Sequence, residues 1–207
     1  MADGGEADAT REALLAAAHE LIARDGAQAL TVRRIATQAG VSTMNVYSRF
    51  GGKDGVIDEL FADGFTRLES AVAAVPVTDD PVTDLVACAH AYLAFARSSP
   101  AYYSLMFDRV LAEYRPGAAA RAVAMATFHQ LVGKVQRVID HGALAMEDAE
   151  LAAGAMWAQV HGLASLAANS RFAGEHHGAP DFDWEAIASV AVSAHVRGLC
   201  HPTVQPA

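Results

Sequence analysis

Helical periodicity runs through almost the whole chain, and it restricts the possible folds more than any other feature. Apolar residues recur every three or four positions, alanine is the most abundant residue, and no segment alternates β-branched with polar residues over the length of a strand. The 207 residues are enough for one or two domains with a hydrophobic core. The sequence therefore predicts an all-α protein of about nine helices.

Capping and turn residues give the expected helix bounds. Thr10 is placed to cap a helix over Arg11–Asp25, which Gly26 ends. Thr31 is placed to cap a short second helix, and Ser42 a third that ends near Phe50. A longer helix is expected from Lys53 or Asp54 to about Val75. Beyond it we expect helices near Pro81–Arg97, Pro100–Tyr114, Gly117–His141, Glu147–Phe172 and Asp183–Leu199.

Two prolines and two acidic residues within Pro76–Pro81 mark the clearest boundary in the chain. We expect a disordered tail over residues 1–9, a first domain over 10–55, and a linking helix over about 53–75. A second domain would then span 76–200, and a C-terminal tail 201–207. The segment from Phe172 to Asp183, which contains His176 and His177, is the longest expected loop.

Charge is unevenly distributed along the chain. The formal net charge is -9, which by itself argues against a protein that coats nucleic acid or anionic membrane. Between Arg24 and Lys53, however, five basic residues face a single acid, Asp25. This basic window carries a net charge of +4 and the remainder of the chain -13, so one segment is suited to an anionic partner.

The sequence argues against several classes of protein. Cys88 and Cys200 are too few and too far apart for a disulfide framework, and the N-terminal residues show no secretory signal. Leu151–Ser170 carries no charge, but its many small residues and its interleaved Gln159, His161 and Asn169 favour a buried helix over a membrane span. No catalytic or zinc-site motif is present, so we expect neither an enzyme nor a cofactor. We also expect a cytoplasmic location.

The basic window has the pattern of a helix-turn-helix motif. Ala36 is small enough for two helices to cross closely, Gly40 relaxes the turn, and apolar residues such as Ile35 and Val46 supply the seam between them. An α-helix fits the major groove, where Asn45 can read adenine and Thr43 or Met44 can contact a thymine methyl group. The predicted DNA-binding residues are Arg33, Thr43, Met44, Asn45, Tyr47, Ser48, Arg49 and Lys53, with Arg33, Tyr47, Arg49 and Lys53 holding phosphates.

The runs TVRRIATQAGVS from Thr31 and NVYSRFGGK from Asn45 closely resemble the DNA-binding region of the tetracycline-repressor (TetR) family. The resemblance covers about Arg11 to Phe65. It departs from the family pattern at Arg49, where His or Tyr is usual, and at Gly51-Gly52, where a proline and a better cap are common. The resemblance implies a homodimeric one-component regulator with a three-helix DNA reader and an all-α effector domain, usually a repressor.

The run around Trp157, His161 and Gly162 resembles the Trp-His-Gly motif of one subgroup of TetR effector domains. Trp157 and His161 share a helix face because they are four positions apart. They either pack structurally, with Gly162 allowing close helix approach, or line a pocket. In the family the last two helices of each subunit form the dimer interface. The residues assigned to it here are Ala158, Ser165, Ile187, Ala191, Val192 and His195.

A ligand pocket is expected among the helices from Val82 to Phe172. Its aromatic and polar residues suit a hydrophobic, uncharged small molecule, which would release the dimer from a palindromic operator whose half-sites are about 34–36 Å apart. The assigned residues are His90, Tyr92, Phe95, Tyr103, Phe107, Phe128, His129, Trp157, His161 and Asn169. Two alternatives stay open, namely a helical metal-responsive regulator, although no metal ligand is assigned, and an interaction module that has lost DNA binding.

Overall fold

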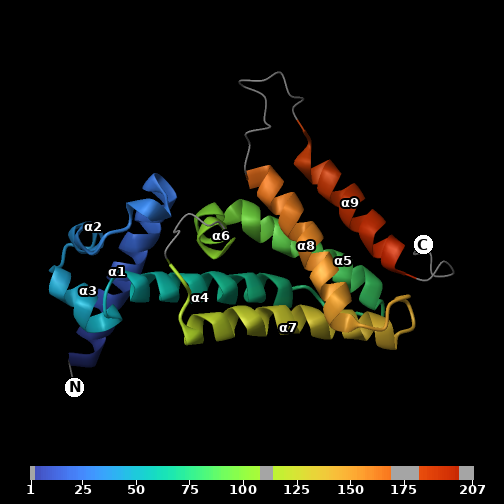
Figure 1. The fold of residues 1–207 in the computed structure, drawn as a ribbon, viewed down its shortest axis with the longest axis horizontal. Coiled ribbons are helices and arrows are strands. Elements are labelled where there is room, and N and C mark those ends of the chain that lie inside the picture. The colour runs from blue at the N-terminus through green and yellow to red at the C-terminus, as the bar shows by residue number, and fades with distance from the viewer. Residues whose placement is uncertain (1–2, 108–113, 169–181, 201–207) are drawn as a thin grey trace. The chain divides into compact units, whose positions relative to one another are not determined.

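The computed structural model describes residues 3–107, 114–168 and 182–200 (Figure 1). Within this part every secondary-structure element is a helix, apart from an isolated antiparallel bridge between Leu144 and Cys200. The predicted all-α class is therefore confirmed. The elements are α1 (Asp3–Asp25), η1 (Ala27–Ala29), α2 (Val32–Gln38), α3 (Thr43–Phe50), α4 (Lys53–Ala73), α5 (Pro81–Ser98), α6 (Pro100–Phe107), α7 (Ala118–Asp140), α8 (Ala149–Ala168) and α9 (Trp184–Leu199).

The chain forms two compact units. Unit 1 comprises residues 1–66 and 99–124, and unit 2 comprises residues 67–98 and 125–207. Helices α4 and α7 therefore each begin in unit 1 and end in unit 2. Unit 1 includes α6 in addition to the first three α-helices, although the sequence predicted a reader that ends near residue 55.

The core of unit 1 joins α1 to the two short helices that follow it. Leu14, Leu21, Ile35, Val46 and Ile57 are almost completely buried there. Helix α6 packs on α1, where the ring of Tyr102 lies 4.5 Å from that of His19, and the Tyr102 hydroxyl donates a hydrogen bond to Asp63 of α4. These contacts explain why α6 belongs with the N-terminal helices.

Helix α5 forms the centre of unit 2. It is buried on most of its circumference, and it contacts both α8 and α9. Its buried residues include Leu85, Cys88, Tyr92 and Leu93. Helix α8 buries a stripe of small and medium side chains, Ala152, Ala153, Met156, Val160 and Ala164, which allows close packing between helices.

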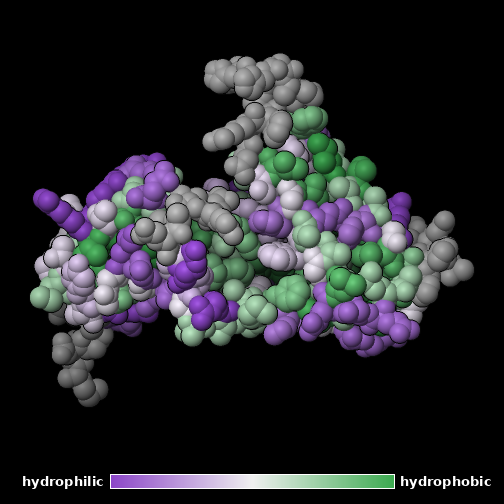
Figure 2. All heavy atoms as spheres, viewed as in Figure 1, coloured by the Kyte–Doolittle hydropathy of each residue, from purple (hydrophilic) through white to green (hydrophobic). Residues whose placement is uncertain are grey.

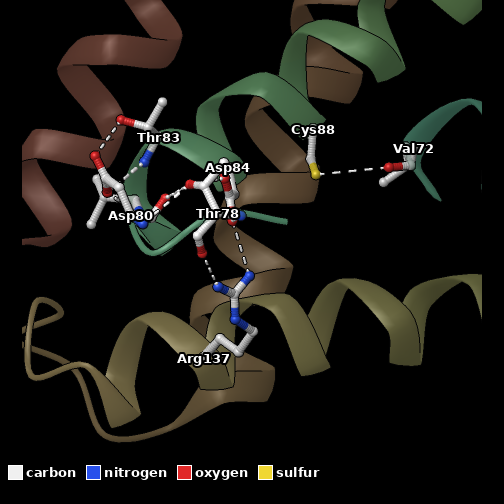
Figure 3. Close-up of polar contacts among 8 residues, drawn as sticks. Val72, Thr78, Asp80, Thr83, Asp84, Cys88 and Arg137 are labelled. Carbon is white, nitrogen blue, oxygen red and sulfur yellow. Dashed lines mark hydrogen bonds and ion pairs between the residues drawn. The ribbon is translucent and has the colours of Figure 1, made fainter. Parts of the chain in front are cut away.

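A polar network fixes the start of α5 (Figure 3). Asp80 accepts hydrogen bonds from the amides of Val82 and Thr83 and so caps the helix. The buried Asp84 accepts from the amide and hydroxyl of Thr78 and from Arg137 of α7, 3.0 Å away, while Arg137 also donates to the carbonyl of Thr78. The predicted boundary at Pro76–Pro81 is therefore an ordered turn between two helices.

The structure corrects several expected bounds. Helix α1 begins at Asp3, so the expected disordered tail over residues 1–9 is wrong from Asp3 on, and Thr10 lies inside the helix instead of capping it. No proline or β-branched residue precedes Thr10, which lets the helix extend. Helix α6 is described over Pro100–Phe107, and Tyr114, its expected last residue, is not helical. No helix in the described part of the chain is long and apolar enough to cross a membrane, and this includes α8.

Candidate nucleic-acid interface

Helix α2 begins as its sequence predicts. Thr31 has an extended backbone, and its hydroxyl accepts a hydrogen bond from the amide of Arg34 at 3.1 Å, which satisfies one of the free donors at the helix start. Ile35 and Ala36 are the buried residues of this helix. A small side chain at position 36 lets α2 pack closely on its neighbours in unit 1, as expected.

The turn after α2 depends on a left-handed backbone at Gly40, where φ is 69°. The amide of Val41 donates to the carbonyl of Ala36 at 3.0 Å, which closes the end of the helix. Ser42 then occupies the N-cap position of α3, although its side chain makes no capping hydrogen bond to the backbone. The helix-turn-helix geometry predicted from the sequence is therefore present.

Helix α3, which we call the reading helix, turns one face into the core of unit 1 and one face outward. Val46 is fully buried, whereas Thr43 and Ser48 are exposed. Met44 is 70% exposed and Tyr47 56% exposed. Large apolar and aromatic side chains this exposed are not core residues. Thr43, Met44, Tyr47 and Ser48 form one continuous outward face, which is the geometry a major groove requires.

The amide of Asn45 is held within the reading helix. Its oxygen accepts a hydrogen bond from Arg49 at 2.7 Å, and its nitrogen donates to the Ser42 hydroxyl at 3.1 Å. The sequence predicted contacts from Asn45 and Arg49 to DNA but did not predict this bond between them, because the two are four positions apart on a helix and their side chains meet only in certain rotamers.

The five cations of the basic window are not equivalent. Asp25 pairs with both Arg24, at 3.1 Å, and Arg34. Arg34 also donates to the carbonyl of Ala29, so its role is to hold α2 against the end of α1. Arg33 is exposed and Lys53 half-buried, and neither makes an ion pair in the described residues. Arg49 differs from both, because it donates a hydrogen bond to Asn45.

Gly51 and Gly52 join the reading helix to α4, and their backbone conformations explain why glycines stand here in place of the family's usual proline and cap. Gly51, with φ of 71°, forms the left-handed C-cap of α3, and Gly52 has φ of 141°. L-residues rarely adopt these conformations. A Cβ at Gly55 would overlap the carbonyl oxygen of Phe50, the last residue of α3. Gly55 is a structural residue that the sequence reading missed, because a helical glycine gives no signal of a close contact.

The residues assigned to a ligand pocket are only partly brought together. In unit 2 the ring of Trp157 on α8 lies 6.3 Å from that of Phe128 on α7 and 5.8 Å from that of His161. Trp157 is 40% exposed, so this aromatic cluster lies at the surface of unit 2 and is not packed in its core. Tyr92 and Phe95 are buried on α5, His90 is half-buried, and His129 is exposed.

Other pocket assignments lie elsewhere in the chain and stay predictions. Tyr103 and Phe107 belong to the aromatic core of unit 1, where Phe107 lies 5.0 Å from Tyr103 and 5.6 Å from Phe65 between ring centroids. Asn169 lies outside the described residues. Nothing lies within 4 Å of a Cβ built at Gly162, so this glycine does not serve close helix approach within the subunit.

Of the residues assigned to a dimer interface, Val192 is placed differently. It is 1% exposed and lies on the buried face of α9 together with Ala188 and Val196. Ala158 is exposed, and Ser165, Ile187, Ala191 and His195 are half-buried. The His195 ring nitrogen Nε2 is buried, and this burial lowers the pKa of His195. In Figure 2 hydrophobic side chains gather where α9 lies.

No group of three or more His, Cys, Asp or Glu side chains that could hold a metal ion occurs among residues 3–107, 114–168 and 182–200. His176 and His177 lie outside the described residues.

Comparison with known proteins agrees with this geometry. A family model described as "Bacterial regulatory proteins, tetR family" matches residues 14–60, and one described as "Tetracyclin repressor-like, C-terminal domain" matches residues 85–192, more than half of the chain. No curated protein matches the chain significantly. The Trp-His-Gly subgroup stays a prediction.

Solved structures show the same fold along most of the chain. A protein of unknown function from Rhodococcus sp. RHA1 is 26% identical with a TM-score of 0.78, covering 93% of this chain and 96% of its own. A regulatory protein of the tetR family from Rhodococcus RHA1 is 21% identical, with a TM-score of 0.69 and coverages of 93% and 98%. The fatty acid degradation regulator FadR from Bacillus halodurans is 16% identical, with a TM-score of 0.71 and coverages of 90% and 94%. Together with the helix-turn-helix geometry, the two family matches show that this chain belongs to the tetracycline-repressor (TetR) family of transcriptional regulators.

Proposed function

We propose that this TetR-family protein is a homodimeric cytoplasmic repressor that leaves a palindromic operator when a small hydrophobic or aromatic ligand binds. The observation that carries the proposal is the outward face of the reading helix, where Met44 and Tyr47 are exposed beside Thr43 and Ser48. A surface that faces only water gains nothing from such side chains, whereas a major groove offers thymine methyl groups and phosphates to them.

The proposed contacts to DNA are of two kinds, to phosphates and to base edges. Arg33, Lys53 and the Tyr47 hydroxyl hold phosphates and supply affinity without sequence information. Thr43, Met44 and Asn45 contact base edges. For Asn45 to read adenine through both amide atoms, its bonds to Arg49 and Ser42 must open, which lets Arg49 turn to a phosphate. The reading helix then exchanges two internal hydrogen bonds for the contacts of Asn45 and Arg49 to DNA.

The outer surfaces of α8 and α9 are the proposed dimer interface. On α9 the exposed residues Ala186, Val190 and Ala194 follow one another at helical spacing on the side opposite the buried stripe. On α8 Leu151, Ala158 and Leu166 are exposed. A second copy related by a two-fold axis would cover both surfaces with the same residues of its own. The half-buried residues of the predicted set, Ser165, Ile187, Ala191 and His195, would lie at its edge.

The aromatic cluster Phe128–Trp157–His161 is the proposed entrance for the ligand in unit 2, because it combines apolar rings with one polar side chain. Tyr92 and Phe95 would line the interior. Ligand binding would favour a dimer whose two reading helices no longer match half-sites about 34–36 Å apart.

Genomic selection of bound DNA tests the proposal, since it yields the operator and its symmetry at once. The selected operator should be palindromic, and affinity for it should fall steeply with salt because phosphates are bound. Arg33→Ala should lower the slope of log affinity against log salt by about 1 for each phosphate that is no longer bound. Arg24→Ala is the matched control, because Arg24 is exposed in the same window but paired with Asp25. A protein that selects no sequence at low salt would refute the proposal.

A further inference from the structure

Asp58 on α4 holds the segment that precedes α7, within unit 1. One of its carboxylate oxygens, Oδ1, accepts a hydrogen bond from the hydroxyl of Tyr114 at 2.6 Å and another from the amide of Gly117 at 2.9 Å. The ring of Tyr114 also lies edge-on to Phe61 of α4, 6.5 Å between centroids. We call these contacts of Asp58, Tyr114 and Gly117 the Asp58 clamp.

The clamp is closely fitted. A Cβ at Gly117 would collide with the second oxygen of the Asp58 carboxylate, a group that two hydrogen bonds already hold in place. Gly117 does not have a positive φ, so this position needs glycine for space and not for backbone conformation. Burial raises the pKa of the Tyr114 hydroxyl, and the neighbouring Asp58 raises it further, so Tyr114 remains a hydrogen-bond donor.

Asp58 is connected to the reading helix by a short series of contacts in unit 1. It lies one helical turn after Gly55, where the chain runs too close to the carbonyl of Phe50, the last residue of α3, to leave room for a Cβ. The next residue, Glu59, forms an ion pair with Arg11 of α1, whose guanidinium lies over the ring of Phe50 at 5.5 Å. A displacement of α4 at Asp58 is therefore imposed on the end of the reading helix.

We infer that Asp58 is a positioning residue, which makes the start of α7 set the orientation of the reading helix through the Asp58 clamp. Helix α7 runs from Ala118 in unit 1 to Asp140 in unit 2, so a ligand that displaces α7 would act on α4 through Tyr114 and Gly117. This inference rests on the proposed function, since it names residues by which the operator-binding state is held. The clamp consists of two hydrogen bonds within unit 1, and each bond can be removed separately by substitution.

Four substitutions in the full-length dimer test the clamp. Gly117→Ala displaces the Asp58 carboxylate, Tyr114→Phe removes one donor, and Asp58→Ala removes the acceptor. Asp58→Asn keeps an oxygen at Oδ1 and should retain the wild-type behaviour. Gly133→Ala is the matched control, because this glycine is also on α7 but a Cβ there would contact nothing within 4 Å.

The first measurement is hydrogen exchange of the amides of residues 53–61, which should become faster in Gly117→Ala and Tyr114→Phe and stay unchanged in Gly133→Ala. The second is binding to the selected operator and to operators whose half-site spacing is changed by one base pair. Loss of one hydrogen bond should lower the preference for the native spacing by roughly fivefold, because loosely held reading heads tolerate other spacings. A residue with a merely structural role would lower stability without changing this preference.

The outcomes separate the two proposals. If the wild-type protein binds operator and Gly117→Ala matches Gly133→Ala in exchange and in spacing preference, the inference is overturned while the proposed function stands. Faster exchange with an unchanged spacing preference also overturns it. A wild-type protein that binds no operator at low salt overturns the proposed function and, with it, the inference.

Discussion

At the scale of single residues, Asn45 decides how the reading helix can recognise DNA. Its amide oxygen is bonded to Arg49 and its nitrogen to Ser42, so a base must compete with two internal hydrogen bonds. The free energy of two such bonds is about 2 kcal/mol net, similar to the roughly 1–3 kcal/mol that a bidentate contact to adenine contributes. Only a well-placed adenine therefore compensates for the internal bonds, and other bases leave them in place.

Asn45→Ala should relax the sequence preference at one operator position and cost about 1–3 kcal/mol of binding free energy on the native operator. The measurement is titration of the variant against operators with each base at that position. Arg33→Ala is the comparison, since removal of a phosphate-binding side chain weakens binding to all sequences alike. A uniform weakening in Asn45→Ala would instead mean that Asn45 serves only to orient Arg49.

Gly51 has a backbone conformation that restricts substitution at the end of the reading helix. Its φ of 71° is left-handed, and a side chain there costs roughly 1–2 kcal/mol. Gly51→Ala should therefore lower the free energy of unfolding by that amount, measured by denaturant titration, and Tm by a few degrees. Gly133→Ala should not destabilise the protein, because it fills open space in a helix. Equal stability of the two variants would contradict the argument.

At the scale of helices, local signals determined which elements could be predicted. The cap at Thr31 and the turn glycine at Gly40 act within a few residues, and α2 and α3 were predicted correctly from them. The start of α1 was missed because Thr10 resembles a cap, although nothing before it stops a helix. The buried face of α9, with Ala188, Val192 and Val196, is hard to predict because Ile187 and Ala191 beside it are equally apolar.

In the candidate site, too, the features set by local sequence could be predicted and those set by distant residues could not. The outward positions of α3 follow from helix periodicity, so Met44 and Tyr47 were predicted on the correct face. The bonds of Arg34 to Asp25, of Arg49 to Asn45 and of Asp58 to Tyr114 depend on rotamers or on residues far apart in sequence. Neither periodicity nor composition carries that information.

The exposed face of α9 gives the prediction that belongs to this scale. Val190 is 70% exposed and lies in the centre of the proposed dimer surface. Val190→Asp would bury an unpaired charge, and the two-fold axis would bring in two of them, so the dimer should weaken by more than about a hundredfold. Sedimentation velocity across a dilution series measures the dissociation constant.

Val77→Asp is the matched control for this substitution, because Val77 is 72% exposed and belongs to the turn before α5, not to the proposed surface of α8 and α9. It should leave the dimer intact. Equal dimer affinity in the two variants would place the interface elsewhere on the molecule.

At the scale of the whole molecule, the net charge of -9 is compatible with DNA binding because the charges are sorted by position. Asp25 binds two of the cations in the basic window, which leaves few of them for phosphates. Each subunit should consequently have weak affinity for non-specific DNA. The dimer gains affinity because it binds two matched half-sites at once.

The stability of the whole chain should depend on pH through Asp84 (Figure 3). Hydrogen bonds from the Thr78 amide and hydroxyl, with help from Arg137, hold the pKa of Asp84 below its usual value. A group whose pKa is lower in the folded than in the unfolded state stabilises the fold above its unfolded pKa, about 3.9 for aspartate. This contribution disappears as the pH falls through the folded pKa.

Asp84→Asn should therefore have a lower Tm than the wild type at pH 7, and the difference should shrink as the pH falls below about 4, where the wild-type carboxylate also takes up a proton. Thermal unfolding followed by circular dichroism across this range measures both curves. Asp79→Asn is the matched control, since Asp79 is an exposed neighbour in the same turn. Because Asp80 also has a lowered pKa, through its bonds to Thr83, some acid sensitivity should remain in both variants. A constant difference between Asp84→Asn and the wild type at every pH would mean that the shape of the side chain, and not its charge, holds Arg137 and Thr78 in place.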